Sequence, residues 1–66
     1  MTLYDRVKQL ADERSMSIAA VERQAGLGGG TIGGWRKKNT HATVGSVGRV
    51  AAVYGMTIDQ LITGVE

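Results

Sequence analysis

Basic side chains that could bind a polyanion are concentrated in the middle of the sequence. Residues 23–58 contain no Asp or Glu, whereas they contain Arg49 and an uninterrupted basic run, Arg36, Lys37 and Lys38. A segment with charges of one sign is the electrostatic pattern expected of a surface that binds phosphates. Three consecutive basic residues are equally typical of a solvated helix end. The pattern alone leaves both interpretations open.

Residues that could carry catalysis or hold a metal are sparse. The chain has no Cys and only one His, His41, so it lacks the ligand sets of common metal sites. The carboxylates of Asp12 and Glu13 are adjacent and would point apart on a helix. The glycine run 28–30 lacks the preceding strand and the lysine of a phosphate-binding loop. We therefore expect no enzyme activity, no cofactor, no metal and no small-molecule substrate.

Length and composition predict one small domain, residues 1–66, that does not enter a membrane. A chain of 66 residues has room for one modest core. The absence of Cys gives no sign of an oxidising compartment. No apolar run approaches the roughly 18 residues of a membrane span, and the polar N-terminus does not resemble a signal peptide. These features predict a cytoplasmic protein.

Capping residues and apolar periodicity predict an all-α fold of five short helices. Thr2, Ser17, Thr43 and Thr57 are each placed to cap a helix, and Thr2 has the capping-box spacing to Asp5. Glycines end the second, fourth and fifth helices. The expected helices are Leu3 to Arg14, Ile18 to Ala25, Gly28 to Lys38, a fourth from the Thr43 cap to Gly55, and a fifth from the Thr57 cap to Gly64.

Apolar residues at helical spacing predict the core of the domain. Trp35 follows Ile32 by three positions, which favours a core position over stacking on a base. The same spacing predicts that the inward residues of the other helices are Leu3, Val7, Leu10, Ala11, Ile18, Val21, Ala25, Val44, Val47, Val50, Ala51, Tyr54, Ile58, Leu61 and Ile62.

The segment from Ser17 to Trp35 has the organisation of a helix-turn-helix. That motif requires a capped first helix, a glycine where the chain turns sharply, and apolar residues on both sides of the turn. Gly26 can supply the turn, with Val21 before it and Leu27 after it. Ten glycines occur in the chain, several of them inside predicted helices, and each such glycine costs about 0.5–1 kcal/mol relative to alanine.

With these features the sequence resembles the helix-turn-helix family of phage repressors, Cro proteins and related bacterial regulators. The resemblance covers nearly the whole chain and rests on three blocks in order. They are the helix-turn segment after Ser17, the Thr-Ile-x-x-Trp element at Thr31, and the helix-glycine-cap-helix ending at residues 50–62. It implies a compact, five-helix, lambda-repressor-like fold and a transcriptional regulator that binds double-stranded DNA, commonly as a homodimer.

Carried over by position, the resemblance implies which residues face DNA. Ser17 and the amides after it would bind a phosphate, as the N-terminus of a helix can. The third helix would enter the major groove. The residues implied to contact DNA are Ser17, Gly28, Gly29, Gly30, Thr31, Gly33, Gly34, Lys37 and Lys38.

The glycines are where this sequence departs from the family pattern. Members of the family place polar or basic side chains at the base-facing positions, and this chain has glycine at most of them. Glu22 stands where the family often has a small residue. A protein-interaction module that kept the fold and lost base-specific reading is therefore the alternative to a repressor-like regulator.

Overall fold

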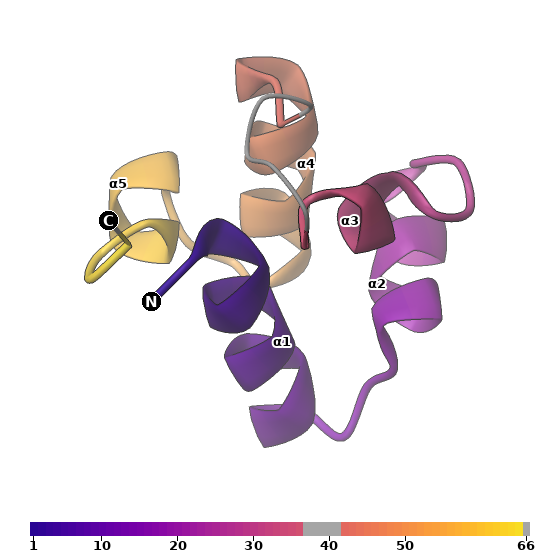
Figure 1. Cartoon of the computed structure of the whole chain (residues 1–66), viewed down its shortest axis with the longest axis horizontal. Coiled ribbons are helices and arrows are strands. Elements are labelled where there is room, and N and C mark those ends of the chain that lie inside the picture. Colours follow the sequence, from indigo (N-terminus) through magenta and orange to yellow (C-terminus); the bar gives the residue numbers. More distant parts are fainter. Residues whose placement is uncertain (37–41, 66) are drawn as a thin grey trace.

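The computed structural model describes residues 1–36 and 42–65, and within these ranges every regular element is a helix (Figure 1). No helix in these ranges is long and apolar enough to cross a membrane. The all-α prediction and the number of helices are confirmed for this part of the chain. The helices are α1 (Leu3–Glu13), α2 (Ile18–Ala25), α3 (Thr31–Gly34), α4 (Val44–Val53) and α5 (Ile58–Leu61).

Four of the five helices begin at a side-chain cap, as predicted. The hydroxyl oxygens of Thr2, Ser17, Thr43 and Thr57 each accept a hydrogen bond from the backbone N–H three residues later. At Thr2 and Thr57 the side chain of the third helical residue completes a capping box. Such caps satisfy N–H groups that have no partner inside the helix, and each contributes about 1 kcal/mol.

Two glycines end helices in the left-handed conformation. Gly26 has φ of 73° after α2, and Gly55 has φ of 68° after α4. In both turns the following N–H reaches back to the helix, from Leu27 to the carbonyl of Glu22 at 2.8 Å and from Met56 to that of Ala51 at 3.0 Å. Glycine adopts this conformation without the steric cost of a Cβ atom, so these two positions set the sharp turns.

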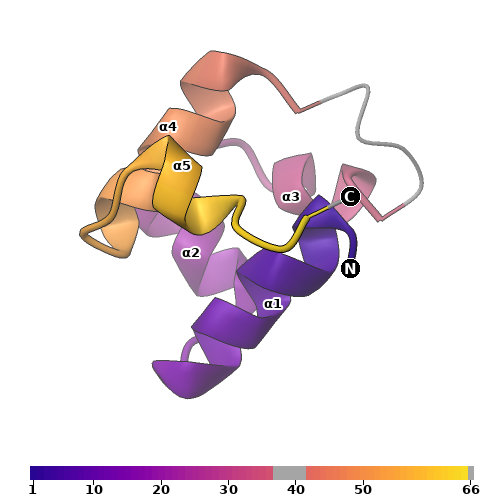
Figure 2. The same cartoon turned by 90° about the vertical axis from the view of Figure 1, so that its left-hand side faces the viewer.

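The core lies between α1, α2 and α4. Helix α2 packs most extensively against α4. Helices α3 and α5 lie on opposite sides of this centre, and Figure 2 shows α5 in front with α3 behind. The predicted core is largely confirmed: the buried apolar residues are Leu3, Val7, Leu10, Ala11, Val21, Ala25, Ile32, Trp35, Val47, Val50, Ala51, Tyr54 and Leu61.

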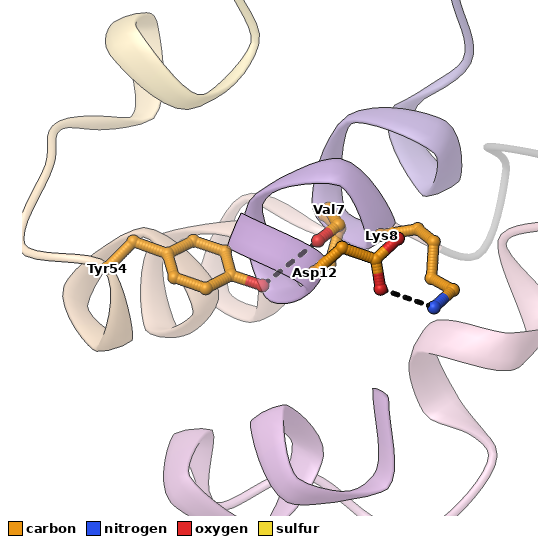
Figure 3. Close-up of polar contacts among 4 residues, drawn as sticks. All are labelled: Val7, Lys8, Asp12 and Tyr54. Carbon is orange, nitrogen blue, oxygen red and sulfur yellow. Dashed lines mark hydrogen bonds and ion pairs between the residues drawn. The ribbon is translucent and has the colours of Figure 1, made fainter. Parts of the chain in front are cut away.

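Polar contacts join α1 to the C-terminal half of the domain. Tyr54 donates its hydroxyl hydrogen bond to the carbonyl of Val7 at 3.1 Å, across the core (Figure 3). The guanidinium of Arg14 lies 4.6 Å from the centre of the Tyr54 ring, and Arg6 Nε donates to the carbonyl of Leu61 at 2.9 Å. These bonds join residues far apart in sequence, and so they tie α1 to the ends of α4 and α5.

Four details of the sequence-based prediction are wrong. The first helix ends at Glu13, and Arg14 follows it as the C-cap. The third helix neither begins at Gly28 nor extends to Lys38: it runs from Thr31 to Gly34, and the φ of 86° at Gly30 interrupts a right-handed helix before Thr31. The last helix ends at Leu61 rather than near Gly64. Val44 and Ile62, expected in the core, are 79% and 39% exposed because no neighbouring helix covers them.

Gly48 lies inside α4, where the fold does not need a glycine. A Cβ atom added there would meet Ile58 Cδ1 at 3.6 Å, an ordinary contact. We expect Gly48→Ala to raise the free energy of unfolding by about 0.5–1 kcal/mol. Gly55→Ala is the contrasting variant, since its left-handed backbone predicts a loss of about 1–2 kcal/mol. Urea denaturation measures both, and a Gly48→Ala protein less stable than the wild type contradicts the prediction.

Burial raises the pKa of Tyr54 above its ordinary value of 10.0, and the nearby positive charge of Arg14 partly opposes that effect. The folded protein therefore holds this proton more tightly than the unfolded chain does. Its contribution to stability is complete below about pH 10 and is lost as the pH rises through the folded pKa. We expect the wild type to lose more stability than Tyr54→Phe between pH 9 and 11.

At neutral pH the same substitution removes the hydrogen bond to Val7, and we expect Tyr54→Phe to lower stability by about 0.5–1.5 kcal/mol. Thermal denaturation at a series of pH values measures both effects. Curves for the two proteins that stay parallel up to pH 11 would show that Tyr54 has no part in the alkaline loss.

Candidate nucleic-acid interface

Ser17 begins the candidate interface at the N-terminus of α2. Its Oγ accepts the N–H of Ala20 at 3.1 Å, and the side chain is exposed. The hydroxyl hydrogen of Ser17 is not used in that bond, so it can be donated to an outside acceptor. The eight-residue helix α2 adds the partial positive charge of its N-terminus. This end of α2 can therefore bind an anion.

The turn between α2 and α3 brings a series of glycines to the surface. Gly28, Gly29 and Gly30 are exposed, and the N–H of Thr31 donates to the carbonyl of Gly28 at 3.2 Å. We use the name glycine surface for residues 28–31 together with Gly33 and Gly34. The segment that carries these residues, the turn and α3, lies beside α2 (Figure 1).

Helix α3 is divided between the core and the glycine surface. Ile32 is fully buried and Trp35 is 1% exposed, so the indole ring belongs to the core, as the spacing predicted. Thr31, Gly33 and Gly34 are partly exposed. Two large apolar side chains therefore anchor a helix whose remaining residues carry almost no side-chain atoms.

Packing inside the chain does not explain these glycines. Apart from its chain neighbours and the backbone of its own helix, a Cβ atom added at Gly29, Gly33 or Gly34 would meet no atom within 4 Å, and one at Gly28 would only touch Thr31 Oγ1 at 3.7 Å. Gly30 differs because its φ of 86° favours glycine. The glycine surface is accordingly a bare section of backbone that a partner could approach more closely than it could approach an ordinary helix.

Basic residues flank the glycine surface. Arg36 is exposed, and its guanidinium lies 5.5 Å from the centre of the Tyr4 ring of α1, within the range of a cation–π contact. Arg49 of α4 reaches the turn, since a Cβ on Gly26 would lie 3.2 Å from its Nη1. Lys37 and Lys38, predicted to contact DNA, lie outside the described residues.

Two acidic side chains of α1, Asp5 and Asp12, form contacts within or next to their own helix. Asp12 forms an exposed ion pair with Lys8 at 2.7 Å (Figure 3), and its hydrogen bond raises the pKa of that lysine. Asp5 accepts the N–H of Thr2 in the first capping box. The ion pair of the described residues, Lys8–Asp12, therefore involves none of the basic residues of the acid-free segment.

Glu22 is the functional candidate that the sequence reasoning missed. Its side chain is buried, with 5% exposure, and its Oε2 accepts the N–H of Ile32 at 2.7 Å. Gly30, the N-cap of α3, gives no side-chain hydrogen bond, so Glu22 replaces a local cap across the turn. The sequence signal was a glutamate among the apolar positions of α2, where a charged residue is rarely buried without a partner.

No group of three or more His, Asp or Glu residues that could hold a metal ion occurs in residues 1–36 and 42–65. A comparison with models of known protein families finds no match, and a search of curated proteins finds no similar sequence. The proposals for this chain therefore depend on its own residues and geometry.

Proposed function

We propose that this chain is a DNA-binding transcriptional regulator of the phage-repressor type, with a lambda-repressor-like fold. In this proposal α2, the Gly26 turn and α3 form the helix-turn-helix, and α3 docks in the major groove of duplex DNA. The supporting observation is the division of the α3 segment, in which Ile32 and the C-cap Trp35 are buried while the glycines lie at the surface with open space around them.

Phosphate contacts supply most of the affinity in this proposal. The exposed hydroxyl of Ser17 and the N-terminus of α2 bind one phosphate. Arg36 and the adjacent Lys37 and Lys38 supply positive charge beyond α3. Because each neutralised phosphate releases counterions, binding weakens as the salt concentration rises.

Few atoms of the glycine surface are available to contact DNA bases. Thr31 carries the one hydroxyl of the glycine surface, and it can donate to or accept from a base edge. At the glycines only backbone N–H and C=O groups are available, but the absence of side chains lets the backbone approach the groove closely. We infer low discrimination among sequences, since no arginine, asparagine or glutamine can form a bidentate base contact from this surface.

The first test is selection of duplexes from a random DNA pool at two salt concentrations. An enriched motif supports a regulator with sequence readout, and a palindrome with half-sites about one helical turn apart supports a dimer. Salt-sensitive retention without enrichment supports a binder of the DNA backbone. Absence of any retention contradicts the proposed function.

The basic run gives a quantitative prediction. We expect Lys37→Ala combined with Lys38→Ala to weaken duplex binding for all sequences alike. The slope of log affinity against log salt should fall by about 0.9 for each phosphate that the variant no longer neutralises. Fluorescence anisotropy at several salt concentrations measures the slope. Lys8→Ala is the control because Lys8 is paired with Asp12 on α1; an equal decrease in the control would assign the effect to net charge alone.

The glycine surface gives a second prediction, with opposite signs for stability and binding. Gly33→Ala combined with Gly34→Ala should raise the free energy of unfolding by up to about 1–2 kcal/mol, because each added Cβ meets open space. The same methyl groups should weaken duplex binding by about tenfold, equivalent to about 1.4 kcal/mol, if the backbone approaches the groove closely. A variant that is more stable and binds DNA as tightly as the wild type would show that close approach is not used.

A protein-interaction module is the second candidate function, favoured by an apolar groove away from α3. Val44 and Ile62 are exposed at this groove, whose lining also includes Leu3, Val47 and Ile58. Exposed apolar patches commonly mark protein contacts, including those of a homodimer. Sedimentation with and without duplex DNA separates the two candidates, since self-association without DNA retention favours the second.

A further inference from the structure

Glu22 is the charged residue that the described fold buries, and its carboxylate lies between two helices. It belongs to α2, with 5% of its surface exposed. Burial of a carboxylate is costly unless hydrogen bonds compensate. Here Oε2 accepts the backbone N–H of Ile32, in the first turn of α3, at 2.7 Å. This distance is at the short end of the range for charge-assisted N–H···O bonds, which are about twice as strong as neutral ones.

Helix α3 needs such an external bond because it cannot hold its own position. It has four residues, two of them glycine, whereas isolated helices shorter than about 12–15 residues are marginal in water. Its N-cap, Gly30, offers no side-chain acceptor. The buried side chains of Ile32 and Trp35 fix how deeply α3 enters the core. The Glu22 bond also fixes the orientation of α3, because a hydrogen bond constrains the direction of the N–H bond in the first turn.

We propose that Glu22 is the positioning residue of the DNA interface, holding the first turn of α3 against α2 and so setting the orientation of the glycine surface. This inference rests on the proposed function for its DNA-binding part. A backbone surface without long side chains cannot compensate for a tilted helix, so its contacts depend on the orientation that Glu22 imposes. The carboxylate also occupies the Ile32 N–H in the first turn of α3, so Ser17, the N-terminus of α2 and the basic residues supply the phosphate contacts of the proposed function.

Two substitutions separate the hydrogen bond from the charge. Glu22→Gln keeps a carbonyl oxygen as acceptor, and Glu22→Leu keeps similar volume without one. Both remove a negative charge, which by simple electrostatics strengthens binding to DNA. We expect Glu22→Leu nevertheless to weaken duplex binding by about tenfold or more, since it leaves the Ile32 N–H without its acceptor. Glu22→Gln should stay within about threefold of the wild type, because a neutral acceptor retains part of the bond.

Glu13→Gln is the matched control for the removed charge, because Glu13 is an exposed carboxylate at the end of α1. Circular dichroism checks that each variant is folded, and the emission of Trp35, the only tryptophan, reports whether α3 remains packed. Glu22→Leu binding DNA as well as the Glu13→Gln control overturns the proposal. So does equal weakening in Glu22→Gln and Glu22→Leu, because the acceptor that Gln retains would then make no difference to binding.

Hydrogen exchange in the wild-type protein tests the bond without any substitution. We expect the protection factor of the Ile32 amide, relative to its intrinsic exchange rate, to be at least about tenfold higher than that of the exposed Gly29 amide, because the Glu22 bond must open first. Equal protection factors overturn the proposal, even if Glu22→Leu does not fold. A wild type that retains no duplex contradicts the proposed function alone, because the exchange rate still decides whether Glu22 holds α3.

Discussion

The hydrogen bond between the Glu22 carboxylate and the Ile32 amide is the contact on which the placement of α3 depends. It joins α2 to a four-residue helix that has neither a local cap nor the length to be stable alone. Apolar burial of Ile32 and Trp35 supplies most of the attraction, but burial is nondirectional. A charge-assisted hydrogen bond at the first turn fixes the orientation of α3, and the orientation of the glycine surface follows from it.

The rest of the domain compensates for glycines that weaken its helices. Four side-chain caps, two of them in capping boxes, fix where helices begin, and Gly26 and Gly55 fix where α2 and α4 end. The contact of Tyr54 with Val7 then closes α1 onto α4. In a chain of 66 residues, where total stability is small, such local contributions are a large fraction of the margin. Helix α3 therefore depends for its placement on its contacts with α2, which itself packs most extensively against α4.

Caps and turns, which depend on neighbouring residues, were predicted correctly from the sequence. Burial and contacts that depend on residues distant in the sequence were missed. The cap at Ser17 and the turn at Gly26 depend on residues within a few positions, so the pattern located them correctly. Val44 satisfied the same helical periodicity as Val47, yet it is exposed, because periodicity does not tell where the neighbouring helix stops. Glu22 was missed because its partner lies ten residues away and a glutamate in a helix is ordinarily solvated.

The glycine surface is the feature that the folded monomer does not account for. A position that needs glycine for its own fold has a positive φ or a crowded Cβ direction, and Gly29, Gly33 and Gly34 have neither. Each costs helix or loop stability that alanine would restore. Gly48 of α4 shares this property, and what sets the glycine surface apart is that several such glycines lie close together in the sequence. In the proposed function these glycines gain a role, because the major groove of DNA is wide enough to admit α3 and to meet its backbone at close range.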